Sequence, residues 1–385
     1  MKGGLPRAVY PLYAIVFIDV LGFTFLIPLL PALGKHFAAS TVVASSLIST
    51  TAAFAALSSP MWGYVSDHIG RKKVLLSSQV FTLGGYVLIA LAGNLPLLFG
   101  SRVVAGLGGG NLGVAQSYIV DVVEPRDRDR ALAYGTAAFG LGFIVGPILS
   151  GLLLRFGLSV PFWAAAGFET INILFTTLYL PDIAAHGDRT RPASLWRTLF
   201  EPGMLNLMSR QMLYIFAFTY FFTVFALYLD RQLHVDAAGA SFLLAAAGAV
   251  GAATLVVGVD RLTKAVGTAR TVQIGFLGAL VAYALVGFVN SLGLFAVVLA
   301  FWAASGATLR PTLNALVADA APPERRGAIM GFADSTNNLA MIFAPAIGGA
   351  VVGIAPRFSG VLPALCVAAG FMLGIWGPRA RAEGK

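Results

Sequence analysis

Long apolar runs alternate with short polar segments along nearly the whole chain. A transmembrane helix needs about 20 mostly apolar residues, because the hydrocarbon core of a bilayer is about 30 Å thick. We predict helices for twelve such runs, at residues 10–31, 42–65, 74–93, 96–120, 131–154, 158–180, 209–229, 238–259, 270–290, 293–317, 328–353 and 358–377. The pattern predicts an all-α polytopic membrane protein whose first segment is a retained helix rather than a signal peptide.

Composition and charge placement support this prediction. Of the 385 residues, 58% are hydrophobic and 11% are charged, against roughly 25% charged in an ordinary soluble domain. The net charge of +9 would suggest nucleic-acid binding in a soluble protein, but here the Lys and Arg residues gather in alternate loops and both tails. The opposite face carries only Lys35, Arg155, Arg231 and Arg357. This bias predicts cytoplasmic termini in an inner membrane and contact with anionic lipids, not with nucleic acid.

The chain also shows an internal repeat. A polar stretch at 181–203 separates the first six predicted helices from the last six. A shift of 198 residues aligns Asp121 with Asp319, Pro125 with Pro323, Pro147 with Pro345, and Gly151 with Gly349. We predict two pseudo-symmetric six-helix halves, 1–180 and 209–385, joined by a cytoplasmic linker at 181–208. Duplicated halves are typical of transporters that hold substrate near the bilayer midplane.

One turn, "GYVSDHIGRKKVLL" at 63–76, is densely charged. It must lie at the membrane surface, because a charge at the bilayer centre costs at least about 2.5 to 3.5 kcal/mol. Gly63 and Gly70 permit close backbone approach and a sharp reversal, and Asp67 suits a helix N-terminus. The simpler alternative is that the basic residues of this turn only set the topology.

Four motifs together resemble the major facilitator superfamily. Its signature between helices 2 and 3 is similar to "GYVSDHIGRKK", and its helix 4 pattern to "RVVAGLGGGNLGVAQSYIVDVVEPRDR". The helix 5 pattern of its antiporter branch is similar to "GFIVGPILSG", and helix 1 contributes "DVLGFTFLIPLLP". The combination resembles the twelve-helix drug/proton antiporters of the tetracycline-efflux group, more clearly in the N-terminal half.

The resemblance implies secondary active transport by alternating access and no enzyme activity. It implies a cytoplasmic latch made by Asp67, Arg71 and Asp121, and a role for Arg102 in proton transfer. The helix 5 motif comprises Gly142, Gly146, Pro147 and Gly151. We interpret it as a packing motif with a proline bend. A nucleotide loop is excluded because no strand precedes the motif.

Ionisable residues inside predicted helices mark substrate or proton paths. They are Asp19, Arg102, Glu169, Asp230, Arg310 and Asp334. We expect Asp19, near mid-membrane, to carry the proton, with Arg102 in a different layer. Arg310 and Asp334 lie at similar depth, so they could build a polar layer or form a pair that only fixes helix packing. Asn337 and Asn338 could join the polar layer of Arg310 and Asp334. Glu169, together with Asn172, either has a function or merely faces another helix or a lipid headgroup.

Helix 7 carries an aromatic stripe of Tyr214, Phe218, Phe221, Phe225 and Tyr228, at steps of 4, 3, 4 and 3. Such spacing places the five side chains on one helical face. Facing a cavity, they would bind a lipophilic or planar substrate. The alternative is that the stripe packs against other helices or faces lipid.

The leading interpretation is a monomeric transporter that exports a small amphipathic or lipophilic, drug-like compound in exchange for protons. Tetracycline itself is not favoured. The resembled tetracycline exporters carry acidic residues in helices 3 and 9, where this chain has "FTLGGYVLIAL" and "TVQIGFLGALVAY". The alternatives are a facilitator or proton symporter for a metabolite, and a non-transporting membrane receptor. The single cysteine, Cys366, and scattered histidines predict no disulfide, metal or cofactor.

Overall fold

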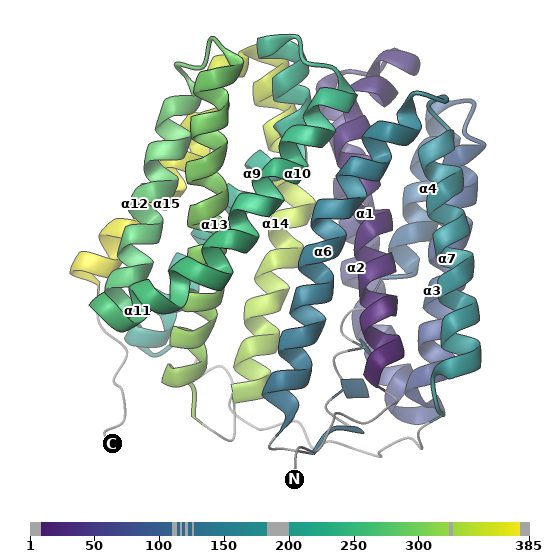
Figure 1. Ribbon diagram of the computed structural model, residues 1–385, viewed down its shortest axis with the longest axis horizontal. Helices are drawn as coiled ribbons and strands as arrows, with labels where there is room; N and C mark the ends of the chain where they lie inside the picture. The colour runs from purple at the N-terminus through teal and green to yellow at the C-terminus, as the bar shows by residue number, and fades with distance from the viewer. Residues whose placement is uncertain are drawn as a thin grey trace. The chain divides into compact units, whose positions relative to one another are not determined.

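The computed structural model describes residues 9–109, 114–115, 118–119, 122–124, 127–182, 200–322 and 326–377. Within its helices, the side chains at 67, 129–130, 133, 136, 326–328, 331 and 334–335 lie outside this description. Every regular element in the described ranges is a helix (Figure 1). The chain forms two compact units.

The first unit comprises Met1–Ala39, Ser46–Arg189 and Ala237–Ala245. Its helices are α1 (Tyr10–His36), α2 (Thr41–Ile69), α3 (Arg71–Ala90), α4 (Leu95–Leu107), α6 (Arg128–Leu154) and α7 (Val160–Tyr179). α1 packs along α6 and α7, and α3 packs along α4 and α7 (Figure 1). α4 ends at Leu107 beside Gly108, and much of the rest of the predicted segment 96–120 lies outside the described residues.

The second unit comprises Ser40–Ser45, Thr190–Asp236 and Ala246–Lys385. Its elements, including α10, which begins in the first unit, are α9 (Pro202–Leu233), α10 (Ala237–Ala253), the π-helix η3 (Thr254–Val259), α11 (Asp260–Val266), α12 (Thr268–Val286), α13 (Leu292–Ala320), α14 (Arg326–Ile354), the 3₁₀-helix η4 (Pro356–Gly360) and α15 (Val361–Trp376). α9 packs along α13, α14 and α15, and α12 packs along α13 and α15 (Figure 1).

The start of α9 differs from the prediction. The sequence pattern placed 202–208 in the linker, whereas α9 begins at Pro202. A proline is favoured in the first turn of a helix, because its fixed φ angle suits the helix and its missing N–H would have no partner there. The helix thus extends beyond its apolar core and brings Asn206 into regular structure.

Ten helices in the described part of the chain are long and apolar enough to cross a membrane. α4, of which 13 residues are described, is not one of the ten, and neither is α7. α7 is less apolar because Glu169, Asn172 and Thr176 lie within it. The protein is therefore a multi-pass membrane protein.

Two pairs of helix starts repeat the same local geometry. Gly70 precedes α3 with φ 97° and ψ 151°, and Gly267 precedes α12 with φ 85° and ψ 156°. Only glycine adopts such angles without strain. Asn94 caps α4 and Ser291 caps α13, each accepting a hydrogen bond from the backbone N–H three residues on. Both pairs are 197 residues apart, one less than the offset in the sequence repeat.

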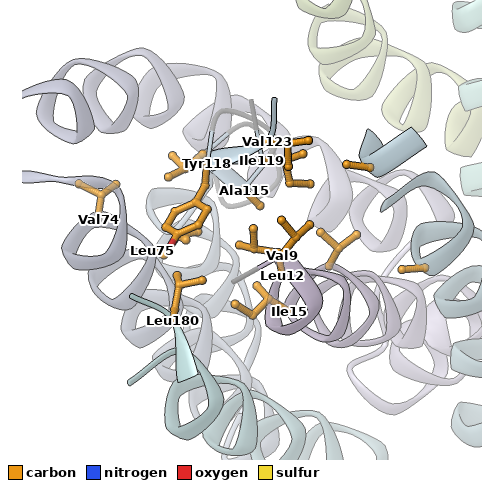
Figure 2. Close-up of a cluster of buried hydrophobic side chains, with 14 of the residues drawn as sticks. Val9, Leu12, Ile15, Val74, Leu75, Ala115, Tyr118, Ile119, Val123 and Leu180 are labelled. Atoms are coloured by element: carbon orange, nitrogen blue, oxygen red, sulfur yellow. The ribbon is translucent and has the colours of Figure 1, made fainter. Parts of the chain in front are cut away.

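One end of the first unit is closed by a hydrophobic cluster (Figure 2). It joins side chains from α1, α3 and the segment after α4, with Val9, Leu12, Val74, Leu75 and Tyr118 among its members. Tyr118 lies at its centre, and its hydroxyl donates to the carbonyl of Pro181 at 2.8 Å. This cluster fixes the ends of α1, α3 and α7 against one another and so sets the register of the polar residues farther along them.

Candidate functional site

One face of α7 is polar and fully buried. Glu169, Asn172 and Thr176 follow the i, i+3, i+7 spacing of a single helical face, and their exposed fractions are 1%, 0% and 0%. α7 packs against α1, α3 and α6. Thr176 accepts a hydrogen bond from the Gln79 amide of α3 at 3.0 Å. α7 therefore turns its polar face toward its neighbours.

Two acids meet at this face. The Asn172 amide donates to Oδ1 of Asp19 on α1 at 3.1 Å, and the Glu169 and Asp19 carboxyls lie close enough to share a hydrogen bond once one of them is protonated. No donor in the described ranges meets Glu169 with good hydrogen-bond geometry, although the Asn172 side chain lies near enough to interact with its carboxyl group. Two adjacent carboxylates in an apolar setting are costly to ionise together.

Tyr86 and Arg102 extend this cluster. The phenol of Tyr86 on α3 lies within electrostatic range of Asp19, Glu169 and Arg102, and a Cβ on Gly22 of α1 would overlap its ring. Arg102 is 4% exposed. Its guanidinium donates to Ser101 Oγ at 3.1 Å and to the Gly85 carbonyl at 3.3 Å.

Tyr86 is thus within electrostatic range of both Arg102 and the two acids, while Arg102 makes no ion pair among the described residues. We call Asp19, Tyr86, Arg102, Glu169 and Asn172 the acidic cluster. The arrangement joins a buried cation to a pair of acids through a phenol, which is a chain of groups able to hold and pass a proton.

The helix 5 motif packs α6 onto α1. A Cβ on Gly142 would lie 2.9 Å from Val20 Cβ, and one on Gly146 would lie 3.0 Å from the Leu21 carbonyl. Pro147 lies inside α6. Gly151 lies farther along, where a Cβ would meet Ser241. Small residues let two helix backbones approach closely, so this motif holds α1, and with it Asp19, in place.

At the charged turn, Gly70 provides the reversal between α2 and α3. Arg71 is 8% exposed and donates to Ser66 Oγ at 2.6 Å. A Cβ at Gly63 would meet nothing within 4 Å, so space is not what requires a glycine there. The side chain of Asp67 and the whole of Asp121 lie outside the described residues.

The aromatic stripe of α9 packs against α12 and α13. Phe218 stacks on Trp302 of α13, with ring centroids 4.9 Å apart and planes 5° apart. Phe221 and Phe225 are both 0% exposed. Phe221 meets Tyr283 of α12 and Trp302 edge-on at 5.7 and 5.9 Å. These contacts favour the packing alternative for Phe221 and Phe225.

The two tyrosines of the stripe bond to neighbouring backbone. Tyr214 donates to the Gly306 carbonyl at 3.2 Å, and Tyr228 donates to the Val286 carbonyl at 2.9 Å. Phe225 and Tyr228 pack on Phe295 of α13. We call the stripe together with Tyr283, Phe295 and Trp302 the aromatic layer.

The other predicted polar layer is described in part. Arg310 is exposed on α13 and lies within electrostatic range of Tyr214. On α14, Asn337 is half-buried and Asn338 is exposed. The side chain of Asp334 is outside the description. Farther along α9, Asp230 lies at the end of the helix.

The Major Facilitator Superfamily profile matches residues 12–258 and 207–385. The chain belongs to the major facilitator superfamily. It is therefore a transporter-family protein and not an enzyme. It is 27% identical over 350 residues to the class C tetracycline resistance protein of Escherichia coli, a match that covers 87% of each chain.

Further relatives point to the same group. The transporter is 25% identical over 354 residues to multidrug resistance protein 2 of Bacillus subtilis (strain 168), covering 87% of this chain and 86% of that one. Among solved structures, the human organic anion transporter MFSD10 (TETRAN) matches with a TM-score of 0.73 and 21% identity, covering 96% of this chain and 99% of that chain. At this identity the likeness shows the fold.

Sequence analysis of the transporter missed Tyr86 and the Gln79–Thr176 contact. The signal for α7 was present, because Glu169, Asn172 and Thr176 repeat at helical spacing within an otherwise apolar segment. No comparable signal marks Tyr86, since a lone tyrosine in an apolar helix most often packs or lies near a membrane interface. Only the pairing of α3 with α1 and α7 brings it to the acids.

Proposed function

We propose that this transporter exports a small amphipathic or lipophilic compound in exchange for protons, by alternating access between two pseudo-symmetric halves of six membrane-spanning helices. The supporting observation is the acidic cluster, a buried carboxyl pair in which no described donor meets Glu169 with good hydrogen-bond geometry. The tetracycline resistance and multidrug resistance proteins among its relatives support the export of drug-like compounds.

The proton step follows from the chemistry of the pair. With one proton the pair carries a single negative charge, which Asn172 partly satisfies by donating to Asp19. A second proton makes the pair neutral and removes the penalty of a buried charge. Loss of both protons places two like charges together, which is tolerated only when water enters. Protonation therefore favours the closed packing of α1, α3 and α7, and deprotonation favours opening.

Arg102 and Tyr86 influence how readily the carboxyl pair releases a proton. Arg102 is held by Ser101 and the Gly85 carbonyl rather than by an acid. Tyr86 interacts electrostatically with both Arg102 and the acids. The cation near them would favour release of a proton from the carboxyl pair without binding the carboxylates directly. Substrate binding on the cytoplasmic side would compete with the proton and couple the two fluxes.

The distribution of Lys and Arg supports a location in the inner membrane with both termini in the cytoplasm. We propose that the transporter acts there as a monomer. The turn at Gly70 and the buried Arg71 would belong to a cytoplasmic latch with Asp67 and Asp121. Such a latch closes in one state and opens in the other.

The experiment is transport in proteoliposomes that contain an internal pH-sensitive dye. Tetraphenylphosphonium, ethidium and lysophosphatidylcholine would be tested as compounds. We expect wild-type protein to move protons against one of these compounds, and Asp19→Asn and Glu169→Gln each to reduce this flux to background. Asp182→Asn, which replaces an exposed carboxylate after α7, serves as the matched control and keeps the flux.

The contradicting outcome is equally clear. Compound transport that proceeds without proton movement and survives both Asp19→Asn and Glu169→Gln would indicate a facilitator. The carboxyl pair would then be a structural feature of the α1–α7 contact.

A further inference from the structure

A cavity of about 680 Å³ lies within the second unit, where the ends of four helices meet. Its wall includes the starts of α9 and α12 and the ends of α13 and α15. These are the ends that the basic loops predict to be cytoplasmic. The cavity is separate from the acidic cluster, whose residues all belong to the first unit.

A buried arginine, two of whose nitrogen atoms have no acceptor among the described residues, lines this cavity. Arg210 of α9 is 6% exposed, and its Nε and Nη2 atoms have no hydrogen-bond acceptor among the described residues. One face of its guanidinium lies over Phe276 of α12, with Cζ 5.5 Å from the ring centroid. A buried charge without an acceptor is costly. The packing holds the cation in place and leaves its hydrogen-bonding edge free.

A glycine makes room for this edge. A Cβ on Gly374 of α15 would lie 2.7 Å from Arg210 Nη2 and would overlap the side-chain nitrogen of Gln273. Gln273 Oε1 is also without a hydrogen-bond partner in the described ranges. Arginine, glutamine and glycine, from α9, α12 and α15, therefore form one polar recess.

The charges around the recess favour an anion. Arg270, in the first turn of α12, adds a second cation at the exposed mouth. Among the described lining residues, Asp319 at the end of α13 is the one acid. The Asn206 amide already donates to the Leu373 carbonyl at 2.9 Å. A helix N-terminus also attracts anions, and the planar guanidinium fork of arginine matches phosphate oxygens.

We propose that this recess binds a phosphate group, carried by an anionic phospholipid headgroup or present as free phosphate. Arg210 would donate through Nε and Nη2, and Arg270 would supply long-range attraction from the mouth. Basic pockets between membrane helices on the cytoplasmic side bind anionic headgroups in this way. The site does not depend on the proposed transport activity.

The test measures thermal unfolding of the purified full chain in an uncharged detergent. The protein is titrated with dioctanoyl phosphatidylglycerol, with dioctanoyl phosphatidylcholine or with inorganic phosphate. A ligand that binds only the folded state raises Tm in a saturable manner. We expect phosphatidylglycerol or phosphate to raise Tm, and phosphatidylcholine to have a smaller effect. A response to phosphatidylglycerol alone identifies the lipid, and an equal response to phosphate identifies the free anion.

Four variants decide whether the effect comes from this recess. Arg210→Gln and Gly374→Ala should each weaken the apparent affinity roughly 10- to 100-fold, the value of one or two hydrogen bonds to a charged group. Arg270→Gln, at an exposed position that cannot disturb folding much, should weaken it less. Arg231→Gln, an exposed arginine near the opposite end of α9, is the matched control and should leave it unchanged.

Two results would overturn the proposal. One is a wild-type Tm that responds to neither anion. The other is an apparent affinity that stays at the wild-type value in both Arg210→Gln and Gly374→Ala, which would place anion binding elsewhere on the protein.

Discussion

In the first unit α1 meets α3 and α7 through Asp19, Tyr86 and Glu169. In the second unit the stripe of α9 meets α12 and α13 through aromatic side chains. The offset of 198 residues places Ala217 and Val367 where the first unit has Asp19 and Glu169, and both are 0% exposed.

The tyrosine is repeated, but its surroundings are not. Tyr283 lies 197 residues after Tyr86. Its hydroxyl accepts a hydrogen bond from Trp302 Nε1 at 3.2 Å inside the aromatic layer. Tyr86 lies instead within electrostatic range of an arginine and two acids. At corresponding positions the duplicated scaffold thus carries a carboxyl pair in one unit and apolar or aromatic packing in the other, so we expect proton handling in the first unit.

The largest effect expected from this contrast is on stability. Trp302→Ala removes the ring that stacks on Phe218 and contacts Phe221 and Phe222. Loss of such a buried aromatic ring costs about 3 to 5 kcal/mol. Unfolding in detergent, followed by circular dichroism, should show this loss, while the number of protons moved per transported compound stays at the wild-type value. A changed number of protons per transported compound in this variant would contradict the separate roles of the two units.

A second prediction compares the paired tyrosines. Tyr86→Phe removes a hydroxyl from the acidic cluster and should slow proton-coupled transport about tenfold, which corresponds to about 1.4 kcal/mol. Tyr283→Phe leaves Trp302 Nε1 without its acceptor and should cost about 1 kcal/mol of stability with little change in transport. Initial rates in proteoliposomes and unfolding midpoints would be measured for both. Equal effects of the two substitutions on the transport rate would argue against different roles.

The smallest effect concerns the edge of the acidic cluster. Gln79→Leu breaks the hydrogen bond to Thr176, and side-chain hydrogen bonds between membrane helices are worth about 0.6 kcal/mol on average. A slightly lower unfolding midpoint with a normal proton flux is therefore expected. Loss of proton flux in Gln79→Leu would show that proton coupling requires Gln79 in addition to Asp19, Glu169 and Asn172.

Much of the fold could be predicted from the sequence, because a bilayer demands long apolar helices and apolar runs are local features. The limits of α13 and α14 lie within a few residues of those predicted. The early start of α9 was missed because 202–208 is not a continuous apolar run, and regular helix continues beyond the hydrocarbon core.

The candidate site was less predictable, because its members come from four helices. Asp19 and Arg102 stand out as charges in apolar segments. The contact of Glu169 with Asp19 depends on the rotation of α7, which apolar runs do not determine. Arg210 and Gln273 meet only through the approach of α15 at Gly374. Helix formation depends on residues close together in sequence, whereas sites depend on packing between helices that are far apart in sequence.

The central claim is that the Asp19–Glu169 pair holds a proton. Infrared difference spectroscopy on the purified transporter at neutral pH tests it through the carbonyl stretch of a buried, protonated carboxyl group. We predict that wild-type protein has this band and that it disappears in Glu169→Gln and is lost or shifted in Asp19→Asn, while Asp182→Asn retains it. A wild-type spectrum without the band, or a band that is unchanged in Glu169→Gln, would contradict the account.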